Sequence, residues 1–210
     1  MEIKVKICGM KERANIEEIA ALKPDYMGFI FYRNSPRFVG ERFNLDWFQY
    51  DIKKVGVFVN QPLEEVVDLA TYNCLDVVQL HGSEGIAYCE ILSERKPELK
   101  IWKSFSVYPG FDLAEMEAYR DATDAYLLDT KDELLGGSGR SFDWEILKKL
   151  DGSKDIVLAG GIGPENIEKV LGLKGQGIKI AVVDVNSKTE TSPGIKSILL
   201  AEEVINKVHA

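Results

Sequence analysis

Eight short runs of strand-forming apolar residues recur along the chain, and this recurrence restricts the fold most strongly. The runs lie at residues 3–8, 26–31, 54–60, 76–81, 100–105, 125–129, 155–159 and 179–185. Successive runs end roughly 20 to 30 residues apart, which is the length of one strand, one helix and two loops. An open doubly wound sheet is the alternative, but no G-x-G-x-x-G segment follows the first run. We therefore expect one α/β domain over residues 1–210, folded as a single (β/α)8 barrel.

Amphipathic segments between these runs predict the helices of the barrel. Apolar residues at helical spacing between Leu63 and Cys74, with Pro62 before them, predict a helix that places Cys74 in the core. Ser192 and Pro193 precede an apolar stripe that extends to Val208, and they predict the start of a closing helix. A helix is also expected around Trp47, where the apolar pattern defines it poorly.

Composition excludes several classes of function. The formal net charge is −8, with acidic and basic residues interspersed, so neither nucleic acid nor an anionic membrane is an expected partner. Three cysteines without a C-x-x-C pair indicate neither a disulfide framework nor a metal site, and a reducing cytoplasm is the expected location. No apolar run reaches the length of a membrane span. The motifs H-E-x-x-H, G-x-S-x-G and the P-loop do not occur.

A glycine-rich turn after the seventh run is a candidate phosphate site. Barrels of this type often bind phosphate between the loops after strands seven and eight. Residues 159–164 include Gly160 and Gly161 and end in a proline that is expected to begin a helix. After the eighth run, Asn186 and Ser187 could complete a phosphate contact, and Asp184 could accept hydrogen bonds from sugar hydroxyls. Ordinary turn formation by these residues is the alternative.

Three further side chains follow predicted strands and could take part in chemistry. Cys8 ends the first run and precedes a glycine that allows close approach, although a thiol here could also be a simple core residue. Asp129 ends the sixth run, where burial would make it a usable proton donor; a capping role is the alternative. Arg37 follows a proline and is suited to a carboxylate, or to a surface ion pair. His81 is more typical of a polar rim or core residue than of a base. The glycine-rich segment 130–141 resembles an active-site lid, and a plain surface excursion is the alternative.

Motifs in order along the chain closely resemble the phosphoribosylanthranilate isomerase family. They are Lys6-Ile7-Cys8-Gly9, Ser35-Pro36-Arg37, Gly56-Val57-Phe58-Val59, Val78-Gln79-Leu80-His81-Gly82, Leu128-Asp129, residues 136–144, Ala159-Gly160-Gly161-Ile162 and Asp184-Val185-Asn186-Ser187. The resemblance implies a TIM-barrel isomerase of tryptophan biosynthesis that uses no cofactor and no metal. Such enzymes rearrange N-(5-phosphoribosyl)anthranilate, a small phosphosugar, to 1-(2-carboxyphenylamino)-1-deoxyribulose 5-phosphate. The resemblance further implies that Cys8 is the general base, that Asp129 is the general acid and that Arg37 binds the anthranilate carboxylate.

The chain departs from the family pattern after Ser187. Lys188-Thr189-Glu190 stands where the family usually has a glycine and an aliphatic residue before the acid, so a lysine could approach the phosphate. The alternatives are another phosphosugar isomerase or lyase, or a catalytically idle barrel that only binds phosphosugars. A monomer and a homodimer are both compatible with the sequence.

Overall fold

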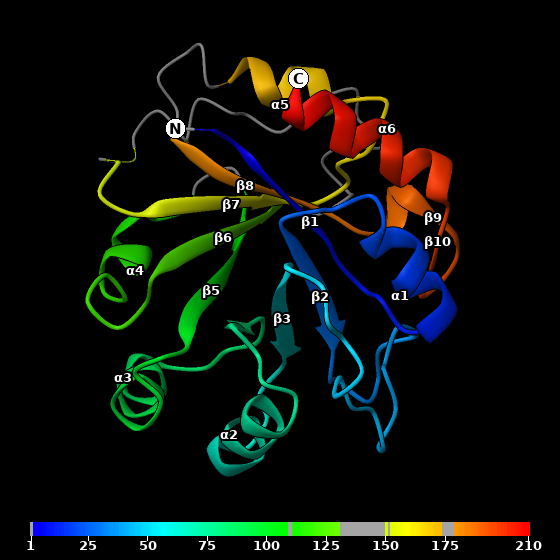
Figure 1. Cartoon of the computed structure of the whole chain (residues 1–210). Helices are drawn as coiled ribbons and strands as arrows, with labels where there is room; N and C mark the ends of the chain where they lie inside the picture. Colours follow the sequence, from blue (N-terminus) through cyan, green and yellow to red (C-terminus); the bar gives the residue numbers. More distant parts are fainter. Residues whose placement is uncertain (1, 109–110, 131–149, 151, 174–178) are drawn as a thin grey trace.

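Eight parallel strands close into a barrel, as the sequence predicts (Figure 1). The computed structural model describes residues 2–108, 111–130, 150, 152–173 and 179–210. The strands are β1 (Lys4–Ile7), β2 (Tyr26–Ile30), β3 (Lys53–Phe58), β4 (Val77–Leu80), β5 (Lys100–Val107), β6 (Ala125–Thr130), β7 (Asp155–Ala159) and β8 (Ile180–Val185). β1 pairs with β2 on one side and with β8 on the other, which closes the sheet. The lid segment 130–141 lies, except for its first residue, outside the described residues.

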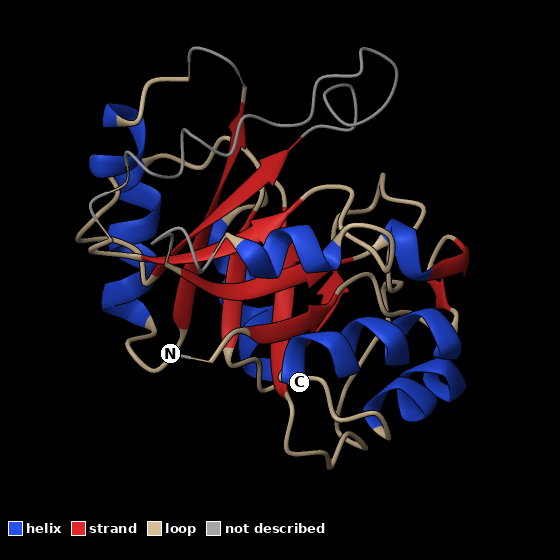
Figure 2. Ribbon diagram, turned by 90° about the horizontal axis from the view of Figure 1, so that it is seen from above, coloured by secondary structure: helices blue, strands red, loops and turns tan. Residues whose placement is uncertain are grey.

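Helices surround the barrel and lie outside the strands (Figure 2). They are α1 (Arg13–Ala20), α2 (Leu63–Tyr72), α3 (Ile86–Arg95), α4 (Ala114–Glu117), α5 (Ile167–Gly172) and α6 (Ile198–His209). Residues 31–52 between β2 and β3, all described, contain turns in place of the helix expected around Trp47, so this prediction was wrong; the segment lacks the regular apolar spacing that would pack a helix against the barrel. Among the described residues, no helix is both long enough and apolar enough to cross a bilayer.

The period-two alternation of each strand divides its side chains between two environments. On β1, Val5 and Ile7 are fully buried in the large cluster that also contains Ile16 of α1, so this face packs against the helices. A second cluster, which contains Trp102 and Leu127, consists of strand residues. By the same alternation Lys6 and Cys8 share the opposite face of the chain from Ile7, and this face points into the barrel.

The prediction that Cys74 packs in the core was wrong. α2 ends at Tyr72 because the chain must turn back toward β4, and Cys74 is exposed with a φ of +48°. Asn73 takes the inward position instead. It is 1% exposed, and its Nδ2 donates to the Leu69 carbonyl at 3.0 Å.

The prediction that Ser192 and Pro193 start the closing helix was also wrong. Ser192 is the last residue of β9 (Glu190–Ser192), and Pro193 lies in the turn to the antiparallel strand β10 (Ile195–Lys196). α6 starts at Ile198, after the N-cap Ser197, whose hydroxyl accepts from the Leu200 amide at 3.5 Å. The β9–β10 hairpin therefore occupies the space between β8 and α6, and this brings Glu190 and Lys196 to the mouth of the barrel.

Candidate active site

A cavity of about 400 Å3 opens at the carboxyl ends of the strands. It is lined by Cys8, Ile30, Tyr32, Ser35, Val57, Val59, Gln79, His81, Asp129, Ala159, Gly160, Gly161, Ile162, Asp184, Asn186 and Ser187. Of the site residues predicted from the sequence, only Arg37 does not line it. A larger hollow of about 1020 Å3 lies beside α1 and includes Arg13 and Trp47, but no predicted site residue lines it. We therefore take the cavity at the strand ends as the candidate active site.

A buried lysine that sequence reasoning did not single out organises the floor of this cavity. Lys6 is 0% exposed, and its Nζ donates to Gln79 Oε1 at 2.6 Å and to Asp184 Oδ2 at 2.8 Å. Lys6 and Asp184 face each other in the register between β1 and β8. Burial disfavours the charge of Lys6, but the charges and hydrogen bonds of Asp184 and Cys8 together outweigh it and raise the pKa of the ammonium. The 2.8 Å contact is that of an ion pair, although burial raises the pKa of the Asp184 carboxyl and the charge of Lys6 only partly offsets this effect.

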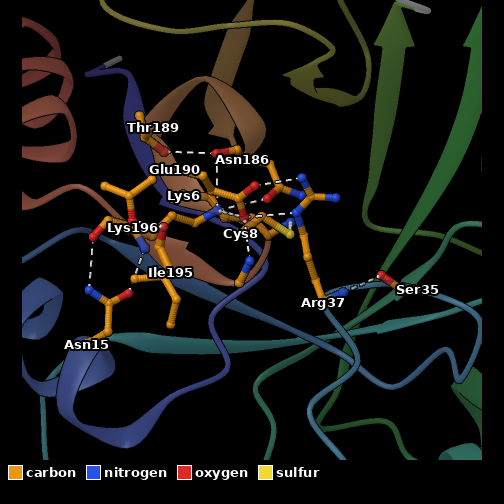
Figure 3. Close-up of polar contacts among 12 residues, drawn as sticks. Lys6, Cys8, Asn15, Ser35, Arg37, Asn186, Thr189, Glu190, Ile195 and Lys196 are labelled. Atoms are coloured by element: carbon orange, nitrogen blue, oxygen red, sulfur yellow. Dashed lines mark hydrogen bonds and ion pairs between the residues drawn. The ribbon is translucent and has the colours of Figure 1, made fainter.

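The same ammonium lies beside the candidate base. Lys6 Nζ is 3.3 Å from Cys8 Sγ, and both side chains are visible at the centre of Figure 3. Burial raises the pKa of the Cys8 thiol, and the charge of Lys6, followed by that of Lys196, lowers it without reversing the effect of burial. Lys6 is thus a cation in contact with the thiol and would stabilise its thiolate form. Because the pKa of Cys8 is nevertheless raised, the thiol of the free protein is mainly protonated near neutral pH.

Two glycines make room for this arrangement. Gly28 on β2 faces the first strand, and a Cβ at this position would lie 2.7 Å from Cys8 Sγ and 2.9 Å from Lys6 Cε. Gly9 has a φ of +75°, and its Cβ would lie 2.6 Å from Asn186 Oδ1 and 2.8 Å from Arg37 Cδ. The close approach expected from the glycine after Cys8 is therefore confirmed.

Arg37 lies beside the cavity and is held by an acid from the hairpin. Its Nε and Nη2 donate to the two carboxylate oxygens of Glu190 at 2.8 and 2.6 Å (Figure 3). Glu190 also accepts from Lys196 Nζ at 2.8 Å and from the Gly194 amide at 3.0 Å. Burial would raise the pKa of Glu190, but these hydrogen bonds lower it below its usual value. One bidentate edge of Arg37 is thus occupied, and Nη1 makes no hydrogen bond to any described residue.

The candidate acid has a histidine as its neighbour. Asp129 Oδ2 lies 3.3 Å from His81 Nε2, and both side chains are about one-third exposed toward the cavity. On its other side, His81 Nδ1 lies 2.9 Å from Gln79 Nε2. His81, expected to be a polar rim or core residue, therefore lies between the candidate acid and the buried polar cluster of Lys6.

The glycine-rich turn after β7 has a left-handed backbone at two glycines, as an ordinary tight turn also requires. Gly160 and Gly161 have φ values of +93° and +59°. The expectation that Pro164 begins a helix was wrong, because Asn166 caps the turn: its Oδ1 accepts from the Gly163 amide at 2.9 Å, and its Nδ2 donates to the Gly161 carbonyl at 2.9 Å. α5 begins only at Ile167 and has 6 residues. Any anion site here must therefore come from the loops themselves.

The loop after β8 completes the rim opposite this turn. Asn186 Oδ1 accepts from Lys196 Nζ at 2.8 Å, and a short 3-10 helix, η4 (Ser187–Thr189), follows. Lys188 Nζ lies 3.6 Å from Glu165 Oε1, and its Cβ would be 2.5 Å from a Cβ at Gly163. Lys188, which departs from the family pattern, thus lies next to the glycine turn at Gly163. Asp184 Oδ1 is buried and has no hydrogen-bond partner in the described part of the chain.

A closed parallel barrel with polar groups gathered at the carboxyl ends of its strands defines a (β/α)8-barrel enzyme. In the described ranges, no three His, Cys, Asp or Glu side chains are grouped closely enough to hold a metal ion. The family model described as N-(5'-phosphoribosyl)anthranilate isomerase matches residues 5–207. The chain belongs to this family of isomerases.

Individual relatives agree with this assignment. The N-(5'-phosphoribosyl)anthranilate isomerase of Parabacteroides distasonis is 39% identical over 208 residues, which cover 97% of this chain and 92% of that protein. The solved isomerase from Thermotoga maritima has a TM-score of 0.80 at 32% identity and covers 99% of this chain and 98% of its own. A second solved isomerase, in complex with reduced 1-(o-carboxyphenylamino)-1-deoxyribulose 5-phosphate, has a TM-score of 0.79 at 29% identity and covers the same shares.

Four residues of the site were not singled out from the sequence: Lys6, Gln79, Glu190 and Lys196. Lys6 could have been found from the period-two alternation of β1, because this alternation places Lys6 on the same face of the strand as Cys8. The alternation of β4 likewise places Gln79 on the face of His81. Glu190 and Lys196 have no comparable signal, because the predicted helix start at Ser192 left no hairpin to position them.

Proposed function

We propose that this protein converts N-(5'-phosphoribosyl)anthranilate to 1-(2-carboxyphenylamino)-1-deoxyribulose 5-phosphate, as the names of its relatives indicate. One observation carries the proposal at the level of residues. A thiol next to a buried ammonium and a carboxyl group next to a histidine line the same cavity, with the glycine turn at its rim. A barrel that only binds a phosphosugar needs neither the thiol nor the carboxyl group.

The substrate has three parts that require recognition, and the site offers a group for each. The glycine turn, Asn186 and Ser187 form the rim that would receive the phosphate, with Lys188 beside it. The unpaired Oδ1 of Asp184 would accept a hydrogen bond from a ribose hydroxyl. Arg37 would bind the anthranilate carboxylate through Nη1, since Glu190 occupies its other edge.

The rearrangement requires one acid and one base. Asp129, in its protonated form, donates a proton to the furanose ring oxygen as the bond from this oxygen to C1 breaks and the nitrogen forms an iminium. The Cys8 thiolate then removes the proton from C2 and leaves an enolamine. The enolamine takes a proton at C1 and loses the proton of its C2 hydroxyl, so that the reaction is an isomerisation without net uptake of protons.

The position of Lys6 supports the role of Cys8. A thiol removes a proton from carbon only as thiolate, and burial alone opposes this charge. The ammonium 3.3 Å away stabilises the thiolate and, through Asp184, is itself kept charged. The base is therefore expected to act in a small ionised fraction of the free enzyme, with its reactivity increasing with pH.

The test is isomerisation of enzymatically generated N-(5'-phosphoribosyl)anthranilate, followed by the loss of its fluorescence. We expect wild-type turnover, and a fall in kcat of roughly 100-fold or more for Cys8→Ser and for Asp129→Asn with little change in KM. Cys74→Ser is the matched control, because this thiol is exposed and outside the cavity. No turnover above the uncatalysed rate would leave the idle phosphosugar-binding barrel as the remaining function. Near wild-type turnover of Cys8→Ser would remove Cys8 from the mechanism.

A further inference from the structure

A continuous series of polar contacts crosses the barrel from β1 to β6. Lys6 Nζ donates to Gln79 Oε1 at 2.6 Å, Gln79 Nε2 lies 2.9 Å from His81 Nδ1, and His81 Nε2 lies 3.3 Å from Asp129 Oδ2. The proposed mechanism uses only the two ends of this series, the neighbourhood of Cys8 and the carboxyl group of Asp129. Gln79 and His81 between them have no role in it so far.

The chemistry of the donors and acceptors determines the orientation of Gln79. An ammonium has only hydrogen-bond donors, so the amide atom 2.6 Å from Lys6 must be the carbonyl oxygen. The reversed amide would place an NH2 group against the ammonium. Gln79 is 2% exposed and Lys6 is 0% exposed, so water does not relieve such a contact. The NH2 group of Gln79 therefore points to His81.

The orientation of Gln79 in turn determines the tautomer of His81. An amide NH2 is a donor only, so His81 Nδ1 must be an acceptor without a proton. In a neutral imidazole the remaining proton is then on Nε2, the nitrogen that faces Asp129.

We propose that Gln79 is a positioning residue: held by Lys6, it keeps His81 in the Nε2–H tautomer, which presents this proton to Oδ2 of Asp129. The inference rests on the proposed function, in which Asp129 is the acid. With Oδ2 facing a donor, the acidic proton of Asp129 resides on Oδ1 and is available to the substrate. After proton transfer, the N–H of His81 stabilises the carboxylate. In the opposite tautomer, Nε2 would accept the acidic proton and withhold it from the ring oxygen.

The tautomer can be measured directly in the full-length protein. Long-range proton–nitrogen NMR spectra of 15N-labelled protein distinguish a protonated from an unprotonated ring nitrogen, and the chain has 2 histidines. At a mildly alkaline pH of about 8 we expect His81 to carry its proton on Nε2. His209, which lies 3.0 Å from Asp25, is the internal reference. A wild-type His81 with its proton on Nδ1 would overturn the proposal without any variant.

Gln79→Glu is designed to reverse the tautomer. A carboxylate accepts hydrogen bonds from Lys6 and from His81 together, so Nδ1 becomes the protonated nitrogen and Nε2 an acceptor. We expect the signals of His81 to interchange while those of His209 stay in place, and kcat to fall by roughly 10-fold or more at a KM within about threefold. An unchanged tautomer in this variant, or a reversed tautomer with wild-type kcat, would refute the role assigned to Gln79.

The readouts separate this inference from the proposed function. If the wild-type protein does not isomerise N-(5'-phosphoribosyl)anthranilate, the proposed function fails while the tautomer remains measurable. If the protein isomerises the substrate but His81 is protonated on Nδ1, only the inference about Gln79 fails.

Discussion

Removing the charge of Lys6 tests the electrostatic basis of the site. Lys6→Met keeps most of the stem of the side chain but deletes the ammonium that lies 3.3 Å from Cys8 Sγ. The single variant also leaves Asp184 buried without its partner, which typically costs about 3–5 kcal/mol of stability. We therefore compare the double variant Lys6→Met/Asp184→Asn with the wild-type protein, in which Asp184 keeps the ammonium charged. Because the charge of Asp184 raises the pKa of the Cys8 thiol, its removal makes the fall in thiolate smaller than loss of the ammonium alone would.

The size of the effect follows from the contact. Two unit charges 3.3 Å apart at an effective dielectric constant of about 20 interact by about 5 kcal/mol, which is an upper bound. A hydrogen bond to a charged group contributes about 1.5–3 kcal/mol, and this range fits one partly desolvated contact better. At a given pH it corresponds to roughly 10- to 150-fold less thiolate.

The assay is the rate of alkylation of Cys8 by iodoacetamide as a function of pH, read from the peptide that contains this residue by mass spectrometry. Only the thiolate reacts, so the rate rises with pH until the thiol is fully ionised. Cys89 is an internal control, because it is buried and burial raises its pKa to about 11. Alkylation of Cys8 in the double variant at the wild-type rate or faster would refute the assignment of Lys6 as the stabilising cation.

Three further predictions concern other parts of the site. Gly28→Ala places a Cβ 2.7 Å from Cys8 Sγ, so we expect the unfolding free energy measured in denaturant to fall by about 1–3 kcal/mol. Wild-type stability of this variant would show that the neighbouring side chains can move aside without cost. Because the folded-state pKa of Glu190 is lowered, the stabilisation from its carboxylate is present above the ordinary value of 4.5 and is lost as the pH falls through the folded-state pKa. Glu190→Gln should therefore be less stable at neutral pH and show a flatter loss of stability in acid, and an equally steep loss would exclude this contribution. Inorganic phosphate should compete weakly with the substrate, and the absence of inhibition at high phosphate would argue against the glycine-turn site.

The barrel and most residues of the cavity could be predicted because they follow from local rules. Each apolar run predicts a strand, and the polar residue that ends the run is then expected at the carboxyl end of that strand. Parallel strands in a barrel bring these ends to one face. Cys8, Asp129 and Asp184, which are more than 50 residues apart in sequence, meet for this reason alone. Their catalytic roles come from the resemblance and stay predictions.

The errors occur where tertiary packing outweighs local pattern. Cys74 continues the helical spacing, but the turn toward β4 ends α2 before it. Pro193 is common at helix starts, but here it belongs to the β9–β10 turn, where Gly194 has a φ of +88°. The clamp role of Arg37 could be suggested from its residue type, whereas its bidentate contact with Glu190 depends on that hairpin and has no local signal.

The pairing of β1 with β8 makes the charge centre a product of chain closure. Lys6 lies near the start of the chain, and its counter-ion Asp184 reaches it only when the last strand has joined the first. During synthesis, a growing chain without β8 would have to bury an ammonium without a counter-ion, which is strongly unfavourable. The charge centre beside the thiol is therefore complete only when β8 has paired with β1 and closed the barrel.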